Sequence, residues 1–90
     1  MRLIITTGTL FTTSRKKQRY EEIARLTLEV SEERTIGELI QLVDRRLRPA
    51  HPGCSYLSLP APHEALPDRA TLGQLEVADG STLRYFSRVR

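Results

Sequence analysis

Apolar and polar residues alternate in two segments of the N-terminal third of the chain, residues 1–7 and 23–30. A period of two places every second side chain on the same face of an extended strand. The pattern predicts two strands, and the polar segment between them predicts an antiparallel hairpin. The inward-facing residues are expected to be Met1, Leu3 and Ile5 in the first strand and Leu26, Leu28 and Val30 in the second.

The connection between these two predicted strands is long for a hairpin. Threonines continue to Thr13, and because they are β-branched they favour an extended backbone. Residues 14–19 are polar or charged and include no apolar side chain. From this composition we expect an extended first hairpin loop of about residues 8–22.

A capping box marks the start of a helix. Thr35 is placed to accept a hydrogen bond from the backbone of Glu38, whose side chain reaches back to the Thr35 N–H. The apolar residues that follow recur at helical spacing, which predicts an amphipathic helix from Ile36 to about Leu47, and Pro49 prevents its continuation. The buried stripe is expected to comprise Ile36, Leu39, Ile40, Val43 and Leu47.

Alternation returns in two segments of the C-terminal half. Residues 55–59 predict a third strand, and the last residues of the chain, which follow the turn signal Asp79-Gly80, predict a fourth. Between them, Thr71 is placed to cap a short helical turn. In the third strand, Leu57 and Leu59 are expected to face the core, with Tyr56 and Ser58 outside. In the last strand, Leu83, Tyr85 and Val89 share one face, and Arg84, Phe86 and Arg88 share the other.

The predicted order of elements is strand, strand, helix, strand, short helical turn, strand. Ninety residues allow one domain, residues 1–90, of the α+β class. One helix covers only one face of a sheet, so the other face stays open to solvent or to a partner. Because the last strand follows a long connection, we expect it in the sheet centre, beside the first strand.

Two stretches of the chain resemble the ubiquitin-like (β-grasp) family. One runs from Leu26-Thr27-Leu28-Glu29-Val30 to Thr35-Ile36, and the other runs from Asp68 through Thr71-Leu72 and Ser81-Thr82-Leu83 to Arg88-Val89-Arg90. The likeness to ubiquitin spans most of residues 23–90. It implies a mixed four- to five-stranded sheet packed on one α-helix. The sequence ends at Arg90, where ubiquitin adds two glycines.

The resemblance implies a protein that works by being recognised. Our first hypothesis is a ubiquitin-like protein modifier, shown without its terminal glycines, which activating, conjugating or deconjugating enzymes recognise through its sheet face and its C-terminal tail. The tail contacts are then Arg88, Val89 and Arg90. The alternative is a natively tail-less ubiquitin-like adaptor or assembly subunit, which binds protein partners non-covalently.

The open face of the predicted sheet holds the best candidate contact surface. Its residues are expected to be Tyr56, Ser58, Arg84 and Phe86. An exposed aromatic side chain flanked by arginine is the composition favoured at the energetic centres of protein interfaces. The competing interpretation is an isolated apolar residue on the surface, which is common in soluble proteins.

A basic cluster in the predicted loop, Arg15, Lys16, Lys17 and Arg19, is a secondary contact candidate. Such a cluster fits nucleic acid or an acidic partner. A solvated loop tip is the more common meaning of a charge run, and Glu21 and Glu22 follow at once. Other proteins are therefore the expected partners, and nucleic acid is the less favoured class.

The sequence offers little for catalysis. His51, Cys54 and His63 lack the paired spacing of a zinc site, and no glycine-rich phosphate loop occurs. We expect no metal, no cofactor and no enzymatic activity. A single cysteine excludes an internal disulfide, and no apolar run suits a membrane span or a signal peptide. These features predict a cytoplasmic protein.

Overall fold

The computed structural model describes residues 1–15, 17–48, 54–60 and 64–87. In these residues, four strands and one helix follow one another along the chain. The elements are β1 (Arg2–Thr12), β2 (Gln18–Glu29), α1 (Ile36–Leu47), β3 (Ser55–Ser58) and β4 (Thr82–Ser87). Within this part of the chain, no helix has the length and apolarity needed to cross a lipid bilayer.

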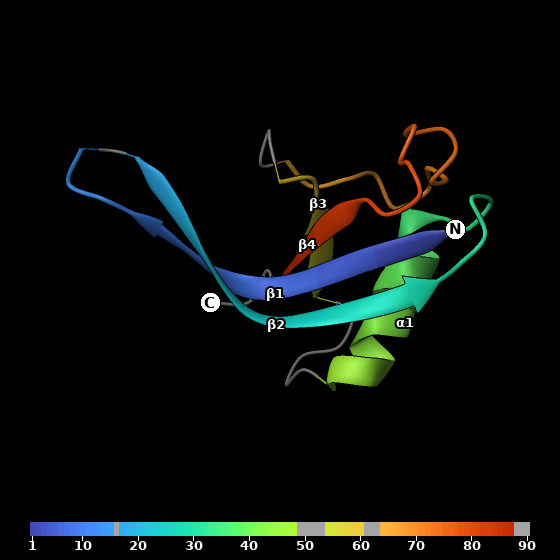
Figure 1. Cartoon of the computed structure of the whole chain (residues 1–90), viewed down its shortest axis with the longest axis horizontal. Coiled ribbons are helices and arrows are strands. Elements are labelled where there is room, and N and C mark those ends of the chain that lie inside the picture. Colours follow the sequence, from blue (N-terminus) through green and yellow to red (C-terminus); the bar gives the residue numbers. More distant parts are fainter. Residues whose placement is uncertain (16, 49–53, 61–63, 88–90) are drawn as a thin grey trace.

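The strands form one mixed sheet in the order β2-β1-β4-β3. The last strand, β4, lies in the centre, parallel to β1 and antiparallel to β3. This confirms the predicted place of the terminal strand. Figure 1 shows α1 lying across one side of the sheet, behind β1 and β2, while the nearer face carries no helix.

Helix α1 begins where the capping box predicts. The Thr35 hydroxyl accepts from the Glu38 N–H at 3.2 Å, and the Thr35 N–H donates to the Glu38 carboxylate at 3.2 Å. Glu38 carries a lowered pKa because the Thr35 backbone and the Arg34 and Thr35 side chains donate to its carboxylate. The helix ends at Leu47, and Arg48, which caps it, adopts the left-handed conformation with φ of 49°.

One predicted core residue of α1 lies outside the core. Leu39 is fully buried, whereas Leu47 at the end of the helix is 37% exposed. Leu47 lines a hollow between α1 and the sheet, where the strands opposite supply the short side chains of Thr7 and Ala24 and leave Leu47 partly uncovered. Met1, Leu26, Val30 and Leu59, which were also expected inside, are only partly buried and pack against the core. The buried core comprises Leu3, Ile5, Leu28, Ile36, Leu39, Ile40, Val43, Leu57, Leu72, Leu83 and Tyr85.

The segment between β3 and β4 is fixed by two local devices. Thr71 and Gln74 cap the predicted helical turn reciprocally, with N–H to side-chain oxygen distances of 3.1 and 3.0 Å. Gly80 adopts a φ of 83°, which a glycine reaches without strain, and closes the predicted Asp79-Gly80 turn. These devices bring the chain back into the centre of the sheet.

A buried polar group ties α1 to the sheet. The Asp44 carboxylate of α1 accepts hydrogen bonds from the hydroxyls of Ser55 (3.1 Å) and Tyr85, and these two hydroxyls lie 2.6 Å apart. Among the described residues, no buried side-chain nitrogen or oxygen lacks a hydrogen-bond partner, so this burial leaves no donor or acceptor unpaired. Burial, with the nearby Asp44 carboxylate, raises the pKa of Tyr85 to about 12.

The first hairpin differs most from expectation. Residues 8–12 and 18–22, which fall within the hairpin loop expected at about residues 8–22, pair as strands from Gly8↔Glu22 to Thr12↔Gln18. The first strand thus extends through the threonine-rich run as far as Thr12. The connection shrinks to residues 13–17, closed by a 2.8 Å hydrogen bond from the Thr13 N–H to the Lys17 carbonyl. Apolar alternation is the sequence signal for a strand that has one buried face. A two-stranded ribbon that is exposed on both faces does not need this alternation, so its polar side chains resembled those of a loop. The paired strands project beyond the sheet as an arm, residues 8–22 (Figure 1).

The hairpin register shifts by one residue where the arm begins. Thr7 lies opposite Ala24, but Gly8 lies opposite Glu22, so Ile23 is an extra residue in β2. Such a bulge bends the strand and moves the side chains beyond it to the opposite face of the sheet. Ile23 itself is 75% exposed.

Replacing Leu39 by alanine should lower the free energy of unfolding by about 2–5 kcal/mol, because Leu39 is fully buried on the core-facing side of α1. Leu47→Ala is the matched control: the same change on the same helix at an exposed site should cost less than about 1 kcal/mol. Urea denaturation of both variants measures the difference. Equal losses would contradict the placement of α1.

Stability should fall between about pH 10 and 12 through Tyr85. Because the folded-state pKa of Tyr85 is raised from 10 to about 12, its neutral form stabilises the fold in full below pH 10 and loses that contribution toward pH 12. Tyr85→Phe should remove this part of the pH dependence, and Tyr56→Phe should keep it. Urea denaturation at a series of pH values from 8 to about 12 tests this; parallel curves for wild type and Tyr85→Phe would refute it.

Candidate protein-binding face

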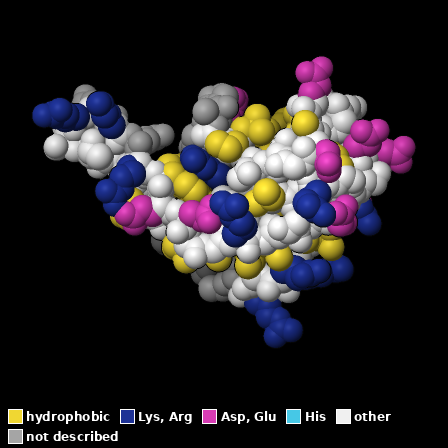
Figure 2. Space-filling view, in the orientation of Figure 1, with side chains coloured by type: hydrophobic (Ala, Val, Ile, Leu, Met, Phe, Trp, Pro, Cys, Tyr) yellow, Lys and Arg dark blue, Asp and Glu magenta, His cyan; other side chains and the backbone are white. Residues whose placement is uncertain are grey.

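The face of the sheet opposite α1 carries the residues that the sequence assigned to a contact surface. On Figure 2, which views this face, hydrophobic side chains gather near basic ones where the arm meets the sheet. Tyr56, Arg84 and Phe86 are each half-buried there, as expected for side chains that stand on the open face. Tyr56 lies opposite Phe86 across the β3–β4 pair.

Three aromatic rings from three strands meet on this face. The rings of Tyr56 and Phe86 are stacked, with centroids 5.5 Å apart and planes 29° apart. Tyr20 of β2 meets Phe86 edge-on, with centroids 5.9 Å apart and planes at 76°. Both geometries are favourable for aromatic pairs. We call Tyr20, Tyr56, Arg84 and Phe86 the aromatic cluster.

Arg84 joins the cluster through its guanidinium group. The Cζ atom lies 3.9 Å from the centroid of the Tyr20 ring, which is a cation–π contact. One guanidinium nitrogen also donates to the Pro60 carbonyl at 3.3 Å. The side chain is therefore held between the Tyr20 ring of the arm and the segment that follows β3.

Tyr20 is the member that sequence reasoning missed. It lies six residues from the inward-facing Leu26, so simple alternation places it on the helix side of the sheet. The extra residue Ile23 reverses this, and Tyr20 pairs with Leu10 on the open face. A glycine inside a threonine-rich strand, Gly8, was the available sequence signal, since such glycines often mark bulges.

The Tyr20 side chain is held in place by contacts to its hydroxyl group and to its ring face. Its hydroxyl lies 2.9 Å from that of Thr6, which is buried in β1, and its ring is covered by Arg84. Gly8 makes room beneath it: a Cβ atom there would lie 2.7 Å from the Tyr20 ring and 2.2 Å from the Glu21 carbonyl oxygen. The absence of a side chain at Gly8 is thus required by the close approach of the Glu21 backbone carbonyl and of the Tyr20 ring.

The prediction that Ser58 belongs to the exposed contact surface is wrong. It lies opposite Arg84 on the open side, yet it is fully buried. The chain after β3 folds back over it, with a bridge between Ser58 and Ala65 and a 2.8 Å hydrogen bond from the Leu66 N–H to the Leu57 carbonyl. A partner cannot reach this hydroxyl, which donates to the Leu59 carbonyl at 3.1 Å.

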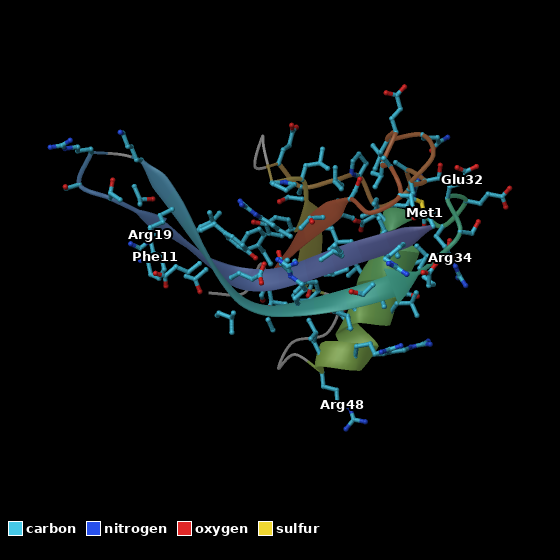
Figure 3. All side chains as sticks on the ribbon, in the orientation of Figure 1. Met1, Phe11, Arg19, Glu32, Arg34 and Arg48 are labelled. Atoms are coloured by element: carbon cyan, nitrogen blue, oxygen red, sulfur yellow. The ribbon has the colours of Figure 1, made fainter. Side chains whose placement is uncertain are left out.

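The two other predicted contact regions have different outcomes. The tail residues Arg88, Val89 and Arg90 lie outside the described part of the chain, as does Lys16. Arg15 and Lys17 are exposed at the tip of the arm. Arg19 belongs to strand β2 and not to a loop. Its guanidinium group lies 5.9 Å from the Phe11 ring centroid (Figure 3) and forms an ion pair with Glu21.

The described part of the chain contains no cluster of side chains that could bind a metal ion. Within it, no three His, Cys, Asp or Glu side chains converge. Cys54 is a free, half-buried thiol, and His51 and His63 fall outside the described residues. The absence of a metal site therefore stays a prediction.

Comparison with known proteins supports the architecture. No protein-family model matches the sequence, and no curated protein matches it. Among solved structures, the fold is similar to that of the Caldiarchaeum subterraneum ubiquitin, with a TM-score of 0.75 over 100% of this chain and 95% of that one. Sequence identity is 24%, so the likeness shows the fold alone. The chain has the α+β ubiquitin-like β-grasp fold.

Gly8→Ala should displace Tyr20 from the open face, because the new methyl group collides with the Tyr20 ring and the Glu21 carbonyl. We expect a loss of about 1–3 kcal/mol in the free energy of unfolding. Gly73→Ala is the control, since a Cβ atom there meets nothing closer than 3.6 Å. Chemical denaturation gives the energies, and NMR shifts of Phe86 report the loss of the edge-on ring. An unshifted Phe86 in Gly8→Ala would contradict this account.

Proposed function

We propose that this chain is a non-catalytic ubiquitin-like protein that works by being bound, with the aromatic cluster as the centre of its protein-binding face. The observation that carries the proposal is the convergence of three half-buried rings and one arginine from three strands. Tyrosine and arginine are among the residues over-represented where protein interfaces gain most of their affinity. They provide a large apolar area with polar groups at its edge.

The cluster is ordered before any partner arrives. Tyr20 is held by Thr6 and Arg84, and Phe86 lies between two other rings. Fixing a flexible side chain on binding costs about 0.5–1.5 kcal/mol, and this cost is reduced when the side chain is already fixed. A partner therefore retains more of the interaction energy as affinity.

In its finer form, the proposal is a protein modifier that activating, conjugating or deconjugating enzymes recognise. Two features support it: the ubiquitin-like fold, and the position of Phe86 two residues before Arg88, the first residue of the tail. A partner that gripped Arg88, Val89 and Arg90 would also reach the cluster. The alternative is an adaptor or assembly subunit that uses the same face without covalent attachment.

Covalent attachment distinguishes these two versions. A modifier should give adducts with other proteins that survive boiling in detergent, and peptide mass spectrometry should place the linkage at the C-terminal end of this chain. An adaptor should give complexes that separate completely under the same treatment. Either result is compatible with binding through the aromatic cluster, so this experiment distinguishes only a covalent modifier from a non-covalent adaptor.

Phe86→Ala tests the face itself, and Phe11→Ala is the matched control, because the chain contains two phenylalanines and Phe11 lies on the arm. Partners are captured with immobilised wild-type protein, and the affinity of each is then measured by calorimetry. Phe86→Ala should weaken binding by about 2 kcal/mol, roughly 30-fold, with little dependence on salt. Equal affinities for wild type and Phe86→Ala across all partners would sink the proposal.

A further inference from the structure

The arm is a structural element that the core does not need. Beyond Ile23, β1 and β2 pair only with each other, and no third strand of the described chain pairs with residues 8–12 or 18–22. Tyr20, near the base of the arm, packs its side chain against Arg84 and Phe86 of β4. In Figure 1 the arm extends along the longest dimension of the molecule, which is 41 Å. A two-stranded ribbon on its own is marginally stable in water.

Several contacts nevertheless order this ribbon. Tyr20 anchors its base to the sheet, and the guanidinium of Arg19 lies over Phe11 halfway along (Figure 3). A backbone hydrogen bond of 2.8 Å from the Thr13 N–H to the Lys17 carbonyl closes its tip. The arm is thus a projecting β-ribbon of defined shape, and not the solvated loop that the sequence suggested.

The side chains at the tip of the arm are suited to binding anions through hydrogen bonds. Residues 12–19 are Thr, Thr, Ser, Arg, Lys, Lys, Gln and Arg, so every side chain donates and no carboxylate is present. The nearby acidic residues are already neutralised, because Glu21 pairs with Arg19 and Glu22 pairs with Arg25. Among the described residues, the exposed cations Arg15 and Lys17 have no ion-pair partner.

We infer that the arm binds a nucleic acid duplex, with Arg15 and Lys17 contacting phosphates. Threonine and serine hydroxyls are common additional donors to phosphate oxygens. Two strands about 4.8 Å apart form a ribbon that fits the major groove of B-DNA, which is about 12 Å wide. These contacts to the duplex use none of the side chains of the aromatic cluster.

The composition of the tip favours nucleic acid over two other anionic surfaces. A membrane-binding hairpin gains affinity by inserting apolar side chains, and residues 12–19 contain none. A protein interface gains affinity from large aromatic or aliphatic anchors. Residues 12–19 contain none, and Phe11, the exposed aromatic residue just before them, already has the Arg19 guanidinium over its ring. Binding by charge and hydrogen bonding alone is the regime of non-specific contact with phosphates.

The test is fluorescence anisotropy of a fluorescein-labelled DNA duplex of about 20 base pairs, titrated with the full chain between 50 and 200 mM salt. We expect sequence-independent binding, with Kd of about 10⁻⁴–10⁻⁶ M at physiological salt and a steep fall in affinity as salt rises. The variant Arg15→Gln/Lys17→Gln should bind at least tenfold more weakly. Its plot of log affinity against log salt should also be shallower by about 2.

Two controls separate this site from net charge and from the aromatic cluster. Arg45→Gln/Arg69→Gln removes the same two positive charges from exposed sites elsewhere and should bind the duplex like wild type. Phe86→Ala should also retain duplex binding. Circular dichroism of each variant confirms that it is folded.

Four outcomes would overturn the inference. The first is no binding by wild type at 50 mM salt, and the second is equal loss of affinity in the two double-glutamine variants. The third and fourth are equal or stronger arm-dependent binding to vesicles of anionic phospholipid, or to a poly-glutamate peptide. In those last two cases the arm is a general anion-binding or membrane-binding element rather than a nucleic acid site.

Discussion

The single extra residue in β2 governs the surface of this protein. Ile23 has no opposite residue in β1, so the side chains beyond it change faces. Tyr20 consequently lies on the open side of the sheet, above Gly8 and against Arg84 and Phe86. The same bulge marks the point where the hairpin leaves the sheet and becomes the arm. Both candidate binding regions therefore depend on one local departure from strand alternation.

The interior depends on a simpler constraint, which is that one helix covers one face. The stripe of α1 packs on Leu3, Ile5, Leu57 and Leu83, and the Asp44, Ser55 and Tyr85 side chains tie helix to sheet by hydrogen bonds. Nothing comparable covers the opposite face within the described chain, so half-buried rings can meet there. One face of the sheet is open because the described chain has a single helix to cover it. The aromatic residues on that face are a feature of this particular sequence.

The two candidate binding regions use different physical forces. The aromatic cluster offers apolar area with little conformational freedom left to lose, a type of contact that salt affects only slightly. The arm offers cations and hydroxyl donors on a thin ribbon, and contact of this type is strongly weakened by salt. Tyr20 connects the regions, since it belongs to the arm in sequence and to the cluster in space.

The sequence alone determined the elements that depend on local chemistry. Capping at Thr35, the helical stripe, the Asp79-Gly80 turn and the central place of the last strand could all be predicted, because each follows from neighbouring residues or from chain connectivity. Tertiary structure decided the length of the hairpin, the burial of Ser58, the exposure of Leu47 and the position of Tyr20. These depend on which distant segment lies against a side chain, and alternation along one strand does not contain that information.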